Sequence, residues 1–169
     1  MVMSTREGLM SIALKARNWM TDEAVNASKS LLRKLQPGEI VAFYQVPLEA
    51  LNVGNKKLGR CDATFEAMKL ASERDVYIDI AQLVPVNHAK LLCDFVVAGK
   101  TATGELRMVA IEINDMMDHN QTQQVARDAV KRLCLSTMGV DYLEMPTYEV
   151  DFTSINKCLD GISKYIQQQ

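Results

Sequence analysis

The chain has 169 residues, a length typical of one domain with a sizeable hydrophobic core. Hydrophobic residues make up 48% of it and charged residues 24%, which is the range of ordinary globular proteins and excludes a largely disordered chain. The formal net charge of -2, from 19 basic and 21 acidic residues, gives no overall attraction to nucleic acid. Any nucleic-acid binding therefore needs a local basic patch.

A helix is predicted near the start of the chain, with Thr21 as its N-cap and Pro37-Gly38 after its end. Its apolar stripe consists of Ala24, Ala27, Leu31 and Leu35. Residues 40–46 follow, and their β-branched and aromatic side chains predict a strand. The helix and the strand together indicate the beginning of an α/β domain.

Residues 47–87 look like an insertion between the elements on either side of them. We expect a helix near residues 63–73 and a short strand near residues 76–80 within this insertion. After it, residues 90–98 and 106–114 predict two strands joined by a glycine-containing turn, which together form a β-hairpin. Both strands are apolar at nearly every position, as is typical of central strands in a sheet.

A long helix is predicted over residues 119–138, with Gly139 as its C-terminal stop. Its core stripe consists of Val125, Ala126, Ala129, Val130, Leu133 and Cys134. A strand over residues 140–145 and a closing helix over residues 155–166 complete the chain. This order of helices and strands predicts an α/β fold with a central mixed β-sheet flanked by helices.

The domain organisation follows from these elements. We expect a single domain over residues 1–169, with a helical extension at 1–20, a core at 21–146 that contains the insertion, and a C-terminal helix at 152–169. No apolar run approaches the roughly 18 residues of a membrane span, and the N-terminal stretch lacks the charge order of a signal peptide. A cytoplasmic protein without a membrane partner is the expectation.

Four cysteines occur without a C-x-x-C pair or a zinc-binding spacing. They are Cys61, Cys93, Cys134 and Cys158. All but Cys61 lie within apolar patterns, so we expect them to be buried free thiols. Free thiols agree with the reducing cytoplasm.

Two acids interrupt strands that are otherwise apolar: Asp94 and Glu112. A charge in a central strand is costly unless it is paired or coordinates a metal ion. If the two strands form a hairpin, the alternation of side chains allows both carboxylates to lie close together on one face. Two such carboxylates suit Mg²⁺ or Mn²⁺, since hard cations prefer oxygen ligands. The alternative is that each acid lies at a strand end and pairs with a lysine or arginine.

A polar face on the long helix accompanies these acids. Gln124, Asp128 and Lys131 are spaced i, i+4 and i+7, which places them on one side of the helix and off its core stripe. This side could face the two carboxylates. The alternative is an ordinary solvent-exposed helix face.

The densest basic stretch is GNKKLGR, which contains Lys56, Lys57 and Arg60. These residues are candidates for nucleic-acid binding, and a solvated loop is the alternative. Ten methionines could line an adaptable surface of an oligomer, with core filling as the more ordinary explanation. The chain lacks a phosphate-binding loop, a dinucleotide fingerprint and a Ser-His-Asp arrangement.

Several segments together resemble a known family. They are LLRKL, EIVAFYQVPLEAL, CDFVV, VAIEIND and QQVARDAVKRL, followed by MGVDYLEMP. The pattern is similar to an uncharacterised bacterial family of the PD-(D/E)XK restriction-endonuclease-like superfamily, often found beside zinc-ribbon or helicase domains. The resemblance covers most of the chain, and its most specific part is the order DFVV, IEIND and D-x-x-K.

This resemblance implies that Asp94 and Glu112 bind Mg²⁺ or Mn²⁺ in phosphodiester hydrolysis, with DNA more expected than RNA as the substrate. The superfamily usually has a lysine, and the nearer family an aspartate, where this chain has Asn114 followed by Asp115. Superfamily members that lack the strand lysine can use one on the next helix. Lys131 matches that position.

Two further family positions are displaced by one residue. The first helix of the family carries a glutamate, and the nearest acid is Glu23, with Ala24 at the matching place. The family histidine corresponds to His119, which with Gln124 could position the water or phosphate. Such departures favour an alternative function. A catalytically degenerate nuclease fold of phage or plasmid origin could bind nucleic acid or a protein.

Overall fold

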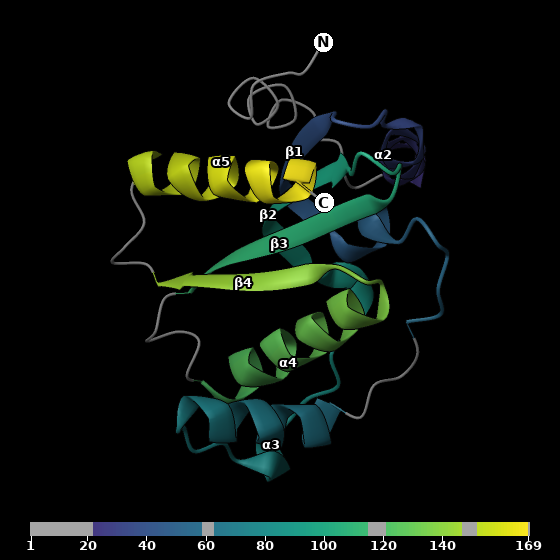
Figure 1. The fold of residues 1–169 in the computed structure, drawn as a ribbon. Helices are drawn as coiled ribbons and strands as arrows, with labels where there is room; N and C mark the ends of the chain where they lie inside the picture. Colours follow the sequence, from purple (N-terminus) through teal and green to yellow (C-terminus); the bar gives the residue numbers. More distant parts are fainter. Residues whose placement is uncertain (1–21, 59–62, 115–120, 147–151, 169) are drawn as a thin grey trace.

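The computed structural model describes most of the chain (Figure 1). The described residues are 22–58, 63–114, 121–146 and 152–168. The helical extension predicted for 1–20 and the N-cap predicted at Thr21 lie outside them. Within the described ranges, no helix is long and apolar enough to span a membrane.

A mixed sheet of four strands forms the centre of the fold, in the spatial order β1-β2-β3-β4. The strands are β1 (Ile40–Pro47), β2 (Leu92–Lys100), β3 (Leu106–Asn114) and β4 (Asp141–Pro146). The first three are antiparallel neighbours, and β4 is parallel to β3. The predicted hairpin is confirmed as β2 and β3, and their apolar sequences agree with their central places in the sheet. The α/β class with a mixed sheet is therefore confirmed.

Helices cover both faces of this sheet. They are α2 (Asp22–Lys34), α3 (Ala63–Arg74), α4 (Thr122–Thr137) and α5 (Phe152–Gln168). One hydrophobic cluster joins α2 and α4 to one face of the strands, and a second cluster joins α5 to the other face through Ile166. In Figure 1, α5 crosses one side of the sheet, while α4 lies on the other side with α3 packed beyond it.

The apolar stripe predicted for the first helix is confirmed at Leu35, which is buried just after the helix ends, and is wrong at Ala27 and Leu31. Leu31 is 43% exposed and Ala27 is exposed, whereas Leu32 is fully buried. Ser28 joins the buried side because its hydroxyl donates a hydrogen bond to the carbonyl oxygen of Ala50 at 3.4 Å. A buried polar residue with a partner of its own is invisible to a count of hydrophobic spacing.

The segment between β1 and β2 differs from its prediction in one element. Its helix is confirmed as α3, but the strand expected at 76–80 is wrong. Tyr77 is 87% exposed and its neighbours Val76 and Ile78 are partly buried, but these residues pair with none of the four strands of the sheet. Three short 3-10 helices complete the segment. They are η2 (Leu48–Leu51), η3 (Ile80–Gln82) and η4 (His88–Lys90), and η4 delays the start of β2 to Leu92.

The long helix and two of the cysteines agree with expectation. The predicted core stripe of α4 is buried except for Leu133, which is partly buried. Cys93 and Cys134 are buried free cysteines. Burial raises the pKa of the Cys93 thiol, which keeps it neutral and unreactive. Cys61 and the side chain of Cys158 lie outside what the structure describes.

Candidate functional site

The hairpin brings the two predicted acids together where its strands separate. The β2–β3 register runs as far as Phe95 opposite Ile111. Beyond this point the amide N–H of Ile113 donates to the carboxylate of Asp94, with 2.9 Å between the nitrogen and Oδ2. The Asp94 side chain thus replaces a main-chain acceptor at the end of the β2–β3 ladder. This hydrogen bond holds the Asp94 carboxylate beside Glu112.

The strand on the other side of β2 is also distorted at this point. Gln45 has a φ of 51°, and the pairing of β1 with β2 omits the position where it would face Asp94. The Gln45 side-chain amide donates to Asp94 Oδ1, with 3.2 Å between the atoms. A positive φ is uncommon for a residue other than glycine and costs about 1 kcal/mol or more. The backbone is therefore strained at Gln45, the residue whose side chain holds the Asp94 carboxylate.

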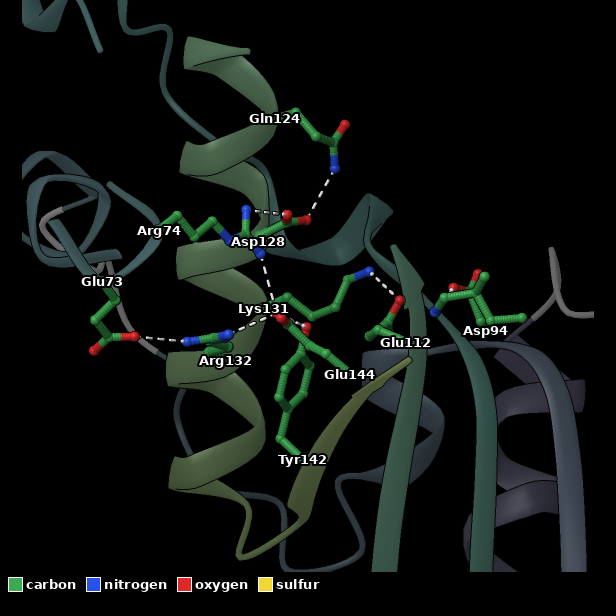
Figure 2. A network of polar contacts seen from close by, with 11 residues as sticks. Glu73, Arg74, Asp94, Glu112, Gln124, Asp128, Lys131, Arg132, Tyr142 and Glu144 are labelled. Atoms are coloured by element: carbon green, nitrogen blue, oxygen red, sulfur yellow. Dashed lines mark hydrogen bonds and ion pairs between the residues drawn. The ribbon is translucent and has the colours of Figure 1, made fainter. Parts of the chain in front are cut away.

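Glu112 is the buried member of the pair, and Lys131 from α4 contacts it. The Lys131 Nζ lies 3.2 Å from Glu112 Oε2, with side-chain exposures of 12% and 4% (Figure 2). The other carboxylate oxygen, Oε1, is buried and has no hydrogen-bond partner among the described residues. An unpaired buried oxygen in a native protein calls for an explanation such as a ligand or a proton.

The pKa of Glu112 points to the same two explanations, a bound ligand or a proton. Burial raises the pKa of Glu112 to about 8; Lys131 opposes this shift, and the negative charge of Asp94 adds to it. Two carboxylates and one ammonium leave one negative charge in excess. A pair of this kind retains a shared proton near neutral pH or binds a cation that neutralises it.

The residues fit a hard divalent cation better than zinc. Structural and catalytic zinc sites take three or four protein ligands, mostly nitrogen and sulfur. Within the described part of the chain, no group of three or more His, Cys, Asp and Glu side chains is placed to hold a metal ion. Mg²⁺, in contrast, is bound through one or two carboxylates and keeps several waters. The carboxylate of Asp94 and Glu112 Oε1 are the oxygens that this site offers.

The polar face predicted on the long helix points inward. Asp128 is only 2% exposed, so the alternative of an ordinary solvent-exposed face is wrong for the middle of α4. The Gln124 amide donates to Asp128 Oδ1 at 2.9 Å, which engages this side chain with its neighbour rather than with the acid pair. Lys131 alone of the three forms an ion pair with Glu112.

The other sequence candidates lie elsewhere or outside the described residues. Glu23 is exposed in the first turn of α2, and within the described ranges no hydrogen bond or ion pair joins it to the acid pair. Lys56 and Lys57 are exposed on the loop after η2. Arg60, Asp115, His119 and the side chain of Asn114 are outside what the structure describes.

Sequence reasoning missed three residues that shape the surroundings of the site. They are Gln45, Arg74 and Glu144. Glu144 carried a usable signal, because it is an acid between the apolar residues Leu143 and Met145 of a strand, and it is the register partner of Glu112. The sequence gives no such signal for Gln45, whose role depends on a backbone distortion. It gives none for Arg74 either, whose helix α3 lies in the segment between β1 and β2.

Comparison with known proteins adds no relative. No family model matches the chain, and neither a curated protein nor a solved structure matches it at a significant level. The chemistry of the site therefore has to be inferred from its own residues and their geometry.

Proposed function

We propose that this chain is a metal-dependent nuclease, which hydrolyses phosphodiester bonds through a site of the PD-(D/E)XK type. The observation that carries the proposal is the 3.2 Å contact between Lys131 Nζ and Glu112 Oε2. It brings a cation from the helix to the acid pair, which is what the resemblance requires of a chain with Asn114 at the usual lysine position. The mixed sheet with helices on both faces is compatible with the restriction-endonuclease-like fold that the same resemblance implies.

The proposed chemistry divides between the acids and the lysine. Asp94 and Glu112 would hold Mg²⁺ or Mn²⁺. A bound metal ion of this kind supplies Lewis acidity and lowers the pKa of a coordinated water. The Lys131 ammonium would stabilise negative charge that develops on the phosphate oxygens, which is worth most in a buried site. DNA is the preferred substrate in this proposal, ahead of RNA.

The test uses three substrates and two variants. Supercoiled plasmid, single-stranded DNA and RNA are each incubated with the protein in Mg²⁺, in Mn²⁺ and in EDTA. We expect cutting that requires the metal and disappears in Glu112→Gln, which keeps the size of the side chain but removes its charge. Glu105→Gln is the matched control, because Glu105 is an exposed acid of the same hairpin.

Each result has a clear meaning. Loss of cutting in Glu112→Gln with retention in Glu105→Gln places the reaction at the acid pair. Equal cutting by both variants would show a contaminating nuclease or another site. The absence of metal-dependent cutting by the unaltered protein on all three substrates would refute the proposal.

A binding module with a degenerate nuclease fold is the second candidate. It is favoured by the contacts of Asp94, whose two oxygens already accept hydrogen bonds from Gln45 and Ile113. It is also favoured by the net charge of -2, which is unlike that of a typical nucleic-acid enzyme. In this case the protein binds nucleic acid or a protein partner equally well in EDTA and after Glu112→Gln, as a gel-shift or pull-down titration would show.

A further inference from the structure

Lys131 forms an ion pair with one acid, and two other acids lie on its own helix and on the strand next to that of its partner. Glu112 is that partner. Asp128 lies three residues earlier on α4, a spacing at which side chains on one helix face can pair. Glu144 is the register partner of Glu112 on the neighbouring parallel strand. Both are therefore rivals for the Lys131 ammonium.

A single guanidinium engages both rivals. Arg74 Nη1 lies 2.9 Å from Asp128 Oδ2, and Arg74 Nη2 lies 3.0 Å from Glu144 Oε1 (Figure 2). The Arg74 side chain is only 13% exposed and that of Asp128 is 3% exposed. Ion pairs at this depth are weakly screened by solvent, so the choice of partner carries a large free-energy difference.

Other donors complete the occupation of the rival acids. The Gln124 amide donates to Asp128 Oδ1. Arg132 Nη2 and the Tyr142 hydroxyl contact Glu144 Oε1 at 2.6 and 3.0 Å. Arg74 differs from Gln124, Arg132 and Tyr142 because its guanidinium contacts both rival acids, one on the helix and one on the strand.

We propose that Arg74 is a positioning residue, which neutralises Asp128 and Glu144 together and so leaves the Lys131 ammonium to Glu112. A lysine could not replace it, because an ammonium lacks the planar fork that reaches two acids at once. The consequence for catalysis rests on the proposed nuclease function. The effect of Arg74 on which acid pairs with Lys131 does not depend on that function.

Arg74 is the last residue of α3, which belongs to the segment between β1 and β2. Those two strands are hydrogen-bonded neighbours, so the sheet itself does not need the long connection. In the proposed role, this segment brings a guanidinium that contacts Asp128 of α4 and Glu144 of β4 at once.

The test follows the side-chain NH₃⁺ resonance of Lys131 by NMR, assigned through its loss in Lys131→Arg. Ion-paired, part-buried ammonium groups exchange slowly and give a distinct signal. Four proteins are compared: the unaltered chain, Arg74→Gln, the triple variant Arg74→Gln with Asp128→Asn and Glu144→Gln, and Arg127→Gln. The last is the control, because it removes an exposed arginine of α4.

We expect a displaced or broadened Lys131 signal in Arg74→Gln, and its return in the triple variant, which removes the rivals together with Arg74. A purely structural role predicts the opposite order, because the triple variant loses more of the network. An unchanged signal in folded Arg74→Gln overturns the proposal. If Arg74→Gln does not fold, the triple variant decides, because it must fold with the original signal; loss of its fold or a displaced signal overturns the proposal.

A kinetic measurement extends the test if the chain cuts nucleic acid. The kcat of Arg74→Gln should fall about 10- to 100-fold, as is usual for residues that orient catalytic groups, with a smaller change in KM. The triple variant should recover most of the loss. Because the NMR result does not depend on cutting, failure of this inference and failure of the nuclease proposal can be told apart.

Discussion

Lys29 and Lys131 both pair with a glutamate and are largely removed from water, and the two pairs differ in the burial of the carboxylate. Lys29 on α2 contacts Glu49 of η2 at 2.6 Å, with side-chain exposures of 8% and 48%. Lys131 contacts Glu112 at 3.2 Å, with exposures of 12% and 4%. In the first pair the carboxylate remains in water, whereas in the second both partners are removed from it.

The difference separates a structural contact from a candidate catalytic one. The Lys29 amine also donates to Asn55 Oδ1 at 3.3 Å, so this pair fastens α2 to the loop after η2 with its polar atoms satisfied. Glu112 instead keeps a buried oxygen without a partner and has Asp94 as a neighbour. Burial of an incompletely paired charge is costly, and a site that persists in this state is a candidate for ligand binding.

The largest expected effect comes from Lys131→Gln. Cutting of the preferred substrate should fall about 100-fold or more, the usual loss when one charge-stabilising donor is removed from a buried site. Stability at pH 6 should change little, because burial raises the pKa of Glu112 to about 8 and its carboxyl group is therefore already protonated at this pH. Initial cutting rates and urea unfolding of the same preparation measure both quantities. Unaltered cutting by a folded Lys131→Gln would exclude this lysine from the reaction.

The second effect is stabilisation by metal. At a free Mn²⁺ concentration about 100 times the Kd, binding to the folded state adds about 2.7 kcal/mol to the free energy of unfolding. Thermal unfolding with Mn²⁺ or EDTA measures the shift. We expect it to vanish in Glu112→Gln and to persist in Glu49→Gln, which alters the other lysine's partner. A shift of equal size in both variants would place the metal elsewhere.

The third effect concerns Lys29, where we expect a loss of stability without a loss of cutting. Lys29→Gln should lower the free energy of unfolding by about 2 kcal/mol, the usual value for hydrogen bonds that involve a charged group. Cutting and the response to metal should stay as in the unaltered chain at temperatures where the variant is folded. Urea unfolding followed by circular dichroism provides the measurement. Lost cutting in a fully folded variant would contradict the assignment of this pair to structure.

The smallest effect concerns pH. The folded state raises the pKa of Glu112 to about 8 from its ordinary 4.5, so between these values the folded state binds a proton more tightly than the unfolded state. Stability therefore falls as the pH rises through this window, by up to about 1 kcal/mol between pH 6 and pH 7 without metal. The slope should be absent from the difference between the unaltered chain and Lys29→Gln. It should appear in the difference between the unaltered chain and Glu112→Gln.

Most of the fold could be predicted because its signals are local. The strand over residues 106–114 was predicted with the bounds that β3 has, and the hairpin followed from the turn between two apolar runs. The phase of α2 could not be predicted, since Ser28 is buried by a hydrogen bond to a distant carbonyl group. The strand predicted at 76–80 is wrong for a related reason. Tyr77 is exposed and Ile78 packs against the cluster formed by α3 and α4, and this packing between distant segments is not visible in the local sequence.

The site was predictable in its charges but not in its supports. Asp94 and Glu112 stood out as acids in apolar strands, and Lys131 was placed by helical spacing and by the family resemblance. Gln45 could not be found, because its role follows from a positive φ that no sequence pattern indicates. Arg74 could not be found either, since it meets Asp128 across 54 positions of the chain.

The backbone at Gln45 has a consequence for how this protein can evolve. A glycine there would adopt the φ of 51° without strain, which recovers about 1 kcal/mol. The same change would remove the amide that holds Asp94 Oδ1, a hydrogen bond to a charged group worth about 2 kcal/mol. Substitution by glycine is therefore disfavoured on balance, and glutamine is tolerated at a position whose backbone conformation suits glycine.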